Sequence, residues 1–437
     1  MFGGRPVACL GSMSSSASAG TRSHHTTAWQ WVALAVLSLS TFVVVTSEML
    51  PVGVLTPMAE GLGVGSGTAG FSLTITGLVT AVTAPVVPRV LGGVDRRWVL
   101  AVSMVVLAAG NALTAVADGF GLLVVSRVIL GLGMGAVWGL AAAVAPRLVG
   151  PRHAALAVSC AVSGVAAASV AGVPAGTVIG DAFGWRAAFV ALAVSAVVLA
   201  AALLVTLPRL PRPRTGPAVG VPAGRSPLAS RAVVGGLAVV VVLVTAHFAA
   251  YTYVRPALEG HGMTAGGIAV ALLVYGVFGL VGNFAAGALA ARRPRATVLL
   301  LAGGIAASVA LLAPSAGLTG VAGVAMGLWG LAYGGLSVAG QLWMQRSAPD
   351  RVEEVTGLYV GLFTAAIALG ALLGGGLVGA VGIVPLLWSA SCLALAALAI
   401  GLAGPRAVPP SGSGTDGNGS RMPAELANHP GNTGSRT

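Results

Sequence analysis

The feature that most constrains this chain is a series of twelve apolar runs, each long enough to cross a lipid bilayer as a helix. A membrane-spanning helix needs about 20 predominantly apolar residues. The chain is 56% hydrophobic and only 8% charged, whereas soluble domains carry roughly 25% charged residues. Lipid must therefore cover the surface that charge cannot cover. We predict an all-α membrane protein with twelve transmembrane helices.

A polar segment divides the predicted spans into two groups of six. This segment, Pro208 to Arg231, is rich in Pro, Gly and Arg, a composition typical of an extended, exposed linker. The predicted regions are an N-terminal tail 1–28, a first half 29–207, a linker 208–232, a second half 233–403 and a C-terminal tail 404–437. The N-terminal tail lacks the apolar run of a signal peptide, and Met13 is an alternative start. The predicted spans are 29–52, 68–88, 98–117, 120–145, 154–178, 187–207, 233–254, 265–290, 297–313, 317–342, 355–380 and 383–403.

The placement of arginine tests this count. The chain has 23 basic residues, and all of them are arginine. With the N-terminus inside, all but Arg127, Arg186 and Arg255 fall in segments on the cytoplasmic side, as expected for membrane proteins. Adding or removing one span would destroy this pattern. We therefore expect a multi-pass protein of the cell membrane with both termini cytoplasmic. The excess of positive charge is explained by this membrane topology, so we expect no nucleic-acid partner.

Two charged residues lie inside the apolar runs. Glu48 is the only one of the eleven acidic residues within a predicted span, and Arg127 is the only arginine. A carboxylate in hydrocarbon costs at least a few kcal/mol, so it faces a polar cavity or stays protonated, and a group poised between these states can carry a proton. We favour this reading of Glu48 over a protonated, purely structural one. For Arg127 we weigh two roles equally. It tunes a nearby acid, or it has a structural role in which it bonds to backbone carbonyls.

Other function classes find little support. The predicted interior holds one glutamate and one histidine, without the clustered acids, nucleophile and base or metal-ligand spacing that an enzyme needs. A phosphate-binding loop for ATP is also missing. The three cysteines, Cys9, Cys160 and Cys392, are far apart and have no metal spacing. We expect no enzymatic activity, no cofactor and no metal.

Four motifs carry a resemblance to a known family. They are Ser47 through Gly53, then Arg127 with Gly131 and Gly135, then Gly172 through Arg186, and finally His247 through Pro256. In this order they resemble the twelve-span drug/proton antiporters of the major facilitator superfamily, in particular the chloramphenicol-resistance, arabinose-efflux and purine-nucleoside-efflux proteins. The resemblance covers about 29–403 and implies two six-helix halves around a midplane cavity. It also implies that Arg127 assists proton transfer.

The fifth span resembles the antiporter motif of that family. Small residues on one helix face let a partner helix approach closely, and proline removes a backbone hydrogen bond and can bend the helix. The resemblance implies that this face seals the interface between the halves, while ordinary helix packing is compatible with the same pattern. The residues concerned are Gly164, Gly172, Pro174, Gly176 and Gly180.

The loop after the second span resembles the cytoplasmic gating motif of the family in a degenerate form. Asp95, Arg96 and Arg97 are present, but the glycine-rich start is shifted to Gly92-Gly93. In the corresponding loop of the second half, Ala291 stands where an aspartate is expected. A basic loop that only sets topology accounts for most of these arginines.

Spans one, four, seven and ten line the pathway in the resembled fold. Their larger side chains form an aromatic surface with few polar groups, as expected for a small amphipathic ligand. Of these, the imidazole of His247 titrates near neutral pH, but we slightly favour a neutral packing residue there. The predicted cavity residues are Thr46, Glu48, Trp138, His247, Tyr251, Trp329 and Tyr333.

The sequence therefore predicts proton-coupled efflux of a small amphipathic molecule such as an antibiotic, sugar or nucleoside. Glu48 and Arg127 are the predicted coupling residues, protons and substrate are the predicted partners, and a monomer is the expected functional unit. The alternative is a facilitator or importer of the same fold that is not driven by protons.

Overall fold

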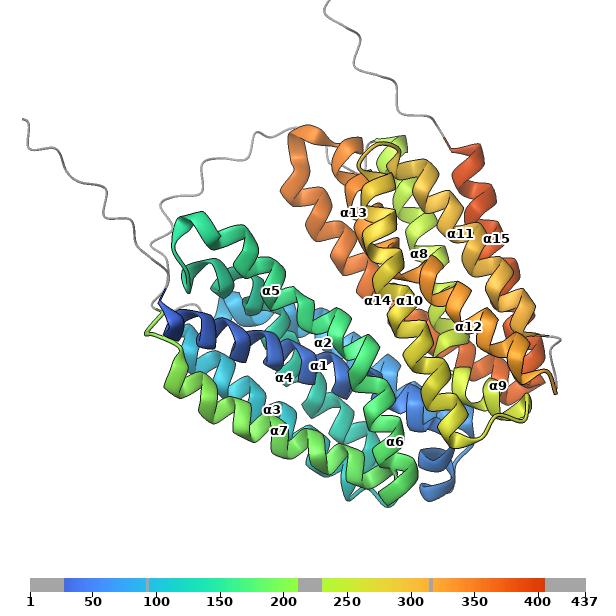
Figure 1. Cartoon of the computed structure of the whole chain (residues 1–437), viewed down its shortest axis with the longest axis horizontal. Helices are drawn as coiled ribbons and strands as arrows, with labels where there is room; N and C mark the ends of the chain where they lie inside the picture. Colours follow the sequence, from blue (N-terminus) through green and yellow to red (C-terminus); the bar gives the residue numbers. More distant parts are fainter. Residues whose placement is uncertain (1–26, 92–93, 211–229, 314–316, 405–437) are drawn as a thin grey trace, which may run out of the picture.

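The computed structural model describes residues 27–91, 94–210, 230–313 and 317–404 (Figure 1). All regular structure within these residues is helical, and twelve helical stretches are long and apolar enough to cross a membrane. The predicted all-α class and the twelve spans are thus confirmed. Nearly all of the predicted N-terminal tail 1–28 and C-terminal tail 404–437, most of the linker 208–232, Met13 and Gly92-Gly93 lie outside the described residues.

The first half begins with a helix that its own sequence caps. The Thr27 hydroxyl accepts a bond from the Gln30 N–H at 3.4 Å, and the Gln30 side chain accepts one from the Thr27 N–H at 2.8 Å. This reciprocal capping satisfies two donors at the helix start. The elements of this half are α1 (Ala28–Gly61), α2 (Ser66–Val90), α3 (Arg96–Ala115), α4 (Phe120–Val144), η1 (Ala145–Arg147), η2 (Pro151–His153), α5 (Ala154–Ala167), the π-helical turn η3 (Ala168–Gly172), α6 (Val173–Phe183) and α7 (Trp185–Thr206).

The second half repeats this plan with two interruptions of its own. The seventh span breaks after Tyr251, and the tenth breaks at Gly335. The elements are α8 (Arg231–Tyr251), α9 (Val254–Gly260), α10 (Ala265–Ala290), α11 (Pro294–Leu312), α12 (Thr319–Gly334), α13 (Leu336–Ser347), η5 (Pro349–Arg351), α14 (Val352–Val381) and α15 (Ile383–Ala403).

The fifth span is longer than the sequence indicated. Pro174 has no N–H to bond with the Val170 carbonyl, and the chain adopts a π-helical turn in which the Val173 N–H bonds to the Ala168 carbonyl. The helix then continues past the predicted limit at residue 178 to Phe183, where Gly184 adopts a φ of 87° that favours glycine. Asp181 therefore lies in the last turn of a spanning helix, as Glu60 does at the end of α1, so the prediction that Glu48 is the only acid within a span was wrong.

Small residues bring the helices of each half together. A Cβ atom on Gly110 of α3 would lie 2.7 Å from the backbone nitrogen of Leu130 in α4, and one on Gly135 of α4 would lie 2.7 Å from Cβ of Thr83 in α2. Lipid tails are as apolar as the side chains, so the hydrophobic effect does not drive membrane helices together. Close packing between their backbones holds them together instead. Larger side chains at these glycines would separate α4 from both neighbours.

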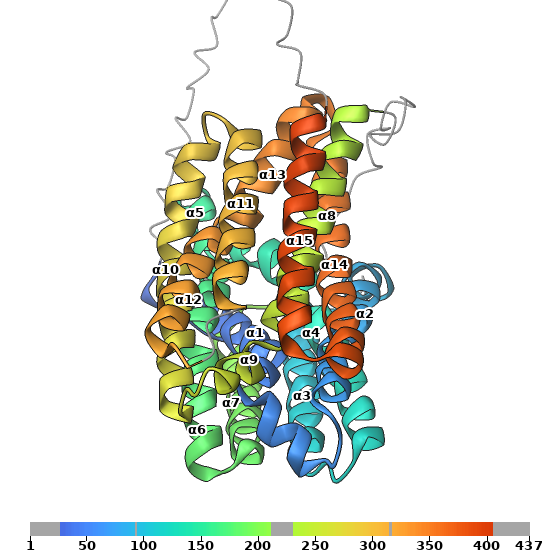
Figure 2. The ribbon, with the colours of Figure 1, turned by 90° about the vertical axis from the view of Figure 1, so that its right-hand side faces the viewer.

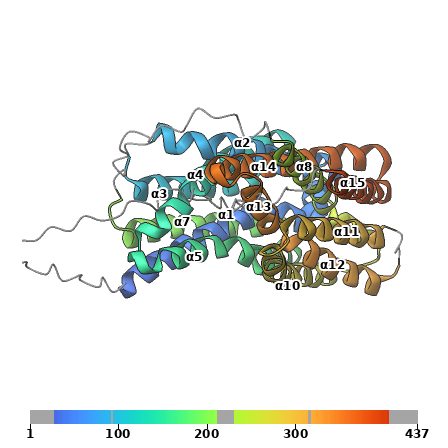
Figure 3. The ribbon, with the colours of Figure 1, turned by 90° about the horizontal axis from the view of Figure 1, so that it is seen from above.

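The two halves meet at one end of the molecule only. Seen from above, α2 lies beside α14 on one side, and α5 leads toward α10 on the other (Figure 3). In Figure 1 α6 and the near end of α10 lie together at this end, whereas α5 and α13 lie apart at the opposite end. We call the end at which the halves meet the closed end. The opposite end, where residues 27 and 404 lie, is the tail end. Figure 2 shows α9 beside α1 at the closed end.

Hydrogen bonds join the halves at the closed end. The Thr74 hydroxyl of α2 donates to the Ala368 carbonyl of α14 at 3.1 Å. The buried Tyr253 hydroxyl, between α8 and α9, lies 3.3 Å from the Gly67 carbonyl of the first half and 3.0 Å from the Ala371 carbonyl of the second. These contacts close the molecule between α2 and α14.

Candidate functional site

Helix α1 lies at the junction of the halves and carries two prolines within its length. Pro51 and Pro57 interrupt the helical hydrogen bonding, and Val54 between them has non-helical angles of φ −121° and ψ 20°. A proline cannot donate to the carbonyl four residues earlier. The carbonyls of Ser47 and Gly53 are therefore free to accept bonds from other helices.

Arg127 takes up the first of these carbonyls. Its Nη1 donates to the Ser47 carbonyl at 3.3 Å, while the Asn111 side chain donates to the Ser47 hydroxyl at 3.0 Å. The guanidinium is fully buried and lies 5.0 Å from the centre of the Phe189 ring. Its Nε and Nη2 atoms have no hydrogen-bond partner. Arg127 thus holds α1 to α4 within the first half, next to the residue that precedes Glu48.

Glu48 has no cation beside it. Among the described residues, its carboxyl takes part in no ion pair and no hydrogen bond, and the side chain is 7% exposed. The next residue on α1, Met49, packs against the hydrophobic cluster that is formed mostly by the second half. Arg127 makes no hydrogen bond or ion pair with the Glu48 carboxyl. It contacts the backbone carbonyl of Ser47, the residue before Glu48. Glu48 thus belongs to the first half and lies in the turn of α1 that faces the second half.

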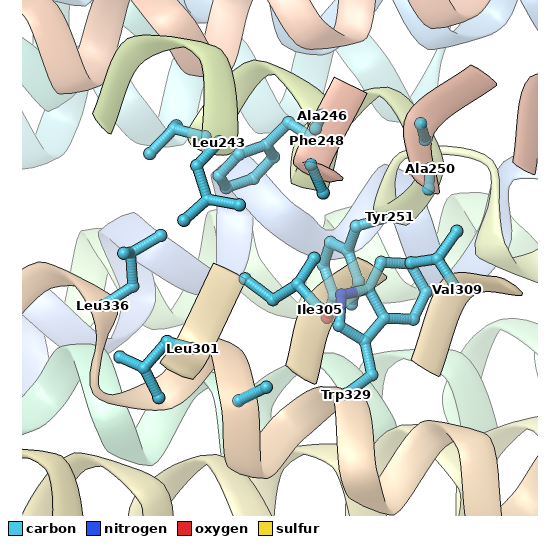
Figure 4. Packing of buried hydrophobic residues seen from close by; sticks show 14 of the residues in the cluster. Leu243, Ala246, Phe248, Ala250, Tyr251, Leu301, Ile305, Val309, Trp329 and Leu336 are labelled. Carbon is cyan, nitrogen blue, oxygen red and sulfur yellow. The ribbon is translucent and has the colours of Figure 1, made fainter. Parts of the chain in front are cut away.

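An aromatic cluster of the second half contains Tyr333. The Tyr333 ring stacks on the His247 imidazole with ring centres 3.5 Å apart and planes 3° apart. The Tyr251 ring stacks on the same imidazole at 5.2 Å. Figure 4 shows Tyr251 and Trp329 side by side in the packed interior of this half. Four of the predicted cavity residues, on α8 and α12, therefore form one cluster.

Hydrogen bonds fix the protonation of His247 in this cluster. The indole N–H of Trp329 donates to His247 Nδ1 at 3.0 Å. An indole nitrogen can only donate, so Nδ1 carries no proton, the imidazole is neutral, and Nε2–H donates to the Tyr275 hydroxyl at 3.4 Å. This geometry agrees with the interpretation of His247 as a neutral packing residue.

Tyr275 was not among the predicted residues. It lies on α10, which corresponds to a span outside the four that the resemblance assigned to the pathway. The signal in the sequence was modest: it is one of only five tyrosines and falls inside an apolar run. Its partners become visible only when α8, α10 and α12 are packed together.

Two predicted cavity residues are placed elsewhere. Thr46 donates its hydroxyl to the Phe42 carbonyl of its own helix at 2.7 Å and packs against Gly172 of the π-helical turn. Trp138 of α4 is half-buried against the core of the first half. Neither side chain joins the aromatic cluster around His247.

The glycines of the predicted antiporter motif face α1 of their own half. Gly176 lies against Leu50, and Gly180 lies against Val54. Further back on the same helix, Gly172 lies against Thr46, and Gly164 lies against Thr41 and Phe42. The resemblance implied that this face seals the two halves against each other, but the structure directs it to α1. This span contacts the second half through the π-helical turn, at Ser169 and Val170, and through Asp181 near the end of α6.

The predicted gating loop is engaged within the first half. The Asp95 carboxylate accepts bonds from the N–H groups of Arg97 and Leu210, both at 3.0 Å, which caps α3 and ties down the chain after α7. Arg96 donates to the Leu91 carbonyl at 3.4 Å. The described side chains of this loop make no ion pair with the second half, as expected where the halves diverge.

The fold and site together define a class of membrane protein. Two bundles that cross the membrane six times each and meet at one end have the arrangement of a transporter with a pathway between halves. A family model described as the Major Facilitator Superfamily matches residues 37–370. The chain belongs to the Major Facilitator Superfamily.

Solved structures share this fold. A bacterial homologue of the human lysosomal transporter Spinster, in an inward-facing and occupied conformation, aligns with a TM-score of 0.70 and 13% identity over 86% of this chain and 97% of that chain. The human organic anion transporter MFSD10 (TETRAN) aligns with a TM-score of 0.60 and 18% identity over 85% and 99% of the two chains. Membership of this family points to a transporter rather than an enzyme.

Proposed function

We propose that this protein is a proton-coupled antiporter that exports a small amphipathic molecule, such as an antibiotic, sugar or nucleoside, across the cell membrane. The observation that carries the proposal is the Glu48 carboxyl, which has no cation beside it and lies next to Met49, where α1 packs against the second half. A charged carboxylate without a counter-charge is costly in an apolar setting. Glu48 therefore takes up a proton when enclosed and releases it when a water-filled pathway reaches it.

Coupling follows from the position of Glu48 between two moving bodies. When the closed end separates, the carboxyl gains access to water from that side, and when the tail end separates, from the other. A substrate that occupies the junction and a proton on Glu48 compete for the same enclosed space. Arg127 supports this role by fixing α1 through the Ser47 carbonyl, directly beside Glu48.

The charges at the junction favour a neutral or cationic substrate. Arg127 is fully buried within the first half and presents no charge to the second. The similar human structure is that of an organic anion transporter. In this chain the carboxyl of Glu48, which has no cation beside it, would repel an anion unless it is protonated.

The orientation completes the proposal. All but three of the 23 arginines lie at the tail end or in segments attached to it under the predicted topology. Since positive residues accumulate on the cytoplasmic side, the tail end faces the cytoplasm and the closed end faces outward. The structure then corresponds to an inward-facing state of the transport cycle.

A vesicle experiment tests the proposal. Compounds that the protein protects against in an efflux-deficient bacterial host are offered to proteoliposomes loaded with a pH-sensitive dye, with and without an imposed proton gradient. The wild type should move substrate and protons in opposite directions, and Glu48→Gln should abolish gradient-driven movement. Glu60→Gln is the matched control, because Glu60 is an exposed acid at the end of the same helix.

Two results would contradict the proposal. Accumulation of substrate against its gradient by Glu48→Gln would show that another group couples the proton. Transport by the wild type at the same rate without a proton gradient, and without dye response, would instead identify a facilitator.

A further inference from the structure

The closed end contains a charged network that joins the two halves. Arg255 of α9 donates from Nη2 to the Asp181 carboxylate of α6 at 2.9 Å, and from Nε to the Glu259 carboxylate at 2.9 Å. Asp181 belongs to the first half, while Arg255 and Glu259 belong to the second. Among the ion pairs of the described residues, Arg255–Asp181 is the one that crosses between halves.

The same arginine also takes up the second carbonyl freed in α1. Pro57 has no N–H for the Gly53 carbonyl, and Arg255 Nη1 donates to this oxygen. The Thr56 hydroxyl of α1 donates in turn to the Glu259 carboxylate. Arg255 therefore fastens α9 to both α1 and α6, and the planar guanidinium suits this, because its donors point in fixed directions.

The centre of the network is shielded from water, while its two acids are partly exposed. The side chain of Arg255 is 6% exposed, that of Asp181 18% and that of Glu259 30%. Charge pairs that are shielded from solvent are weakened little by salt, and removing one partner leaves the other uncompensated. The ion pair between Arg351 and Glu354, by contrast, is exposed and lies within the second half.

The partners of Arg255 divide into those that move with it and those that do not. Glu259 is four residues away on the same short helix, so this pair stays intact when the halves separate. Asp181 and the Gly53 carbonyl belong to the other half and would be left behind. Water at the opened end can solvate Asp181, while Glu259 continues to neutralise Arg255. The network thus combines a permanent counter-ion with a releasable one.

We propose that Arg255 is the latch of the closed end: its bonds to Asp181 and Gly53 hold α6 and α1 against α9, and their release opens this end in each transport cycle. The inference rests on the proposed transport function, in which both ends open alternately. Arg255 is a positioning residue, because it acts through α1, which carries Glu48 on the inner side of the kink at Val54.

The test measures how often the closed end opens, without substrate or proton gradient. Cys9, Cys160 and Cys392 are replaced by serine, and Thr74→Cys introduces a thiol at the seam between α2 and α14, where Thr74 is buried against Ala368. Reaction of this thiol with a maleimide is followed in purified protein in detergent. We expect Arg255→Gln to raise the labelling rate about tenfold, a shift within the range of ordinary conformational coupling.

Three further variants separate the latch from general damage. Asp181→Asn removes only the releasable partner and should also raise the rate, which keeps the test available if Arg255→Gln does not fold. Arg255→Lys keeps the charge but cannot serve all three acceptors, so its rate should be intermediate. Arg186→Gln is the matched control, because Arg186 donates to the Ala117 carbonyl at 2.8 Å within the first half and should not change the rate.

Unchanged labelling in folded Arg255→Gln and Asp181→Asn would overturn the inference, as would an equal increase in Arg186→Gln. Because labelling needs neither substrate nor protons, failure of the latch differs from failure of the proposed antiport. A faster rate in both latch variants, in a protein that moves no protons, would support the latch and contradict the antiport.

Discussion

Gly276 of α10 lies directly against Ser169 of the π-helical turn, so the backbones of the two halves touch there. A Cβ atom at position 276 would stand 2.5 Å from the Ser169 carbonyl oxygen and 2.6 Å from the Cα atom of Val170. Both are backbone atoms, which cannot rotate away as a side chain can. The π-helical turn next to Pro174 thus provides one side of a seam that only glycine fits on the other.

Gly276→Ala should therefore push the halves apart at the closed end. Overpacking costs about 1–3 kcal/mol, enough to shift an equilibrium between two conformations of similar free energy. We expect faster maleimide labelling of Thr74→Cys in this background, with the protein still inserted and folded. Gly287→Ala on the same helix is the control, because its nearest neighbour would be Cγ1 of Val338 at 3.9 Å. Equal labelling rates in the two variants would show that the contact between α10 and the π-helical turn adjusts to the added methyl group without separating the halves.

The fold could be predicted from the sequence because its determinants are local. Run length and the side on which arginines fall do not depend on tertiary contacts, and both the class and the count of twelve spans are confirmed. The limits of the broken spans were less accurate. Pro174 and Gly184 indicate a bend and an end, but the sequence does not show that the helix resumes between them and encloses Asp181.

The candidate site could be predicted only in part, because its contacts join distant segments. The resemblance assigned spans 1, 4, 7 and 10 to the pathway, and four of the residues selected on that ground lie in one cluster: His247, Tyr251, Trp329 and Tyr333. The directions of side chains did not follow: Thr46 turns to its own half. The latch was missed although Arg255 and Glu259 stand at the i,i+4 spacing of helical ion pairs. Its third member, Asp181, is 74 positions away.

The proposed orientation predicts which positions react from outside intact cells. Gly260→Cys, at the end of α9, lies in open space and should be labelled by a membrane-impermeant maleimide. Ser226→Cys, in the linker segment outside the described residues, should react only with a permeant reagent. The measurement compares both reagents on both variants. Labelling of position 226 from outside, with protection of position 260, would reverse the assignment of the tail end to the cytoplasm.

Trp329→Phe should destabilise the second half through His247. The change keeps an aromatic ring but removes the indole N–H, which leaves the buried Nδ1 atom without a donor. We expect a loss of about 1 kcal/mol in the free energy of unfolding, visible as a lower unfolding temperature in detergent. Trp388→Phe is the control, because Trp388 is 46% exposed on α15. An unchanged unfolding temperature for Trp329→Phe would show that the bond to His247 contributes little to the fold.

Gly176→Leu should leave the protein folded but abolish coupled transport. Gly176 faces the side chain of Leu50, which stands two residues after Glu48 on α1, and both residues are buried. Gly176→Ala should be mild, because the tip of Leu50 can rotate away from one added methyl group. Leucine is too large for that adjustment, so α1 must shift away from α6, at a cost of about 1–3 kcal/mol, and Glu48 must shift with it.

Gly235→Leu on α8 is the control, since a side chain there meets open space. Efflux and proton leak are measured in the same vesicles, with protein amounts matched by blot. Wild-type efflux by Gly176→Leu would show that transport does not depend on the seat of α1 against α6, and the mechanism that places Glu48 through this contact would have to be given up.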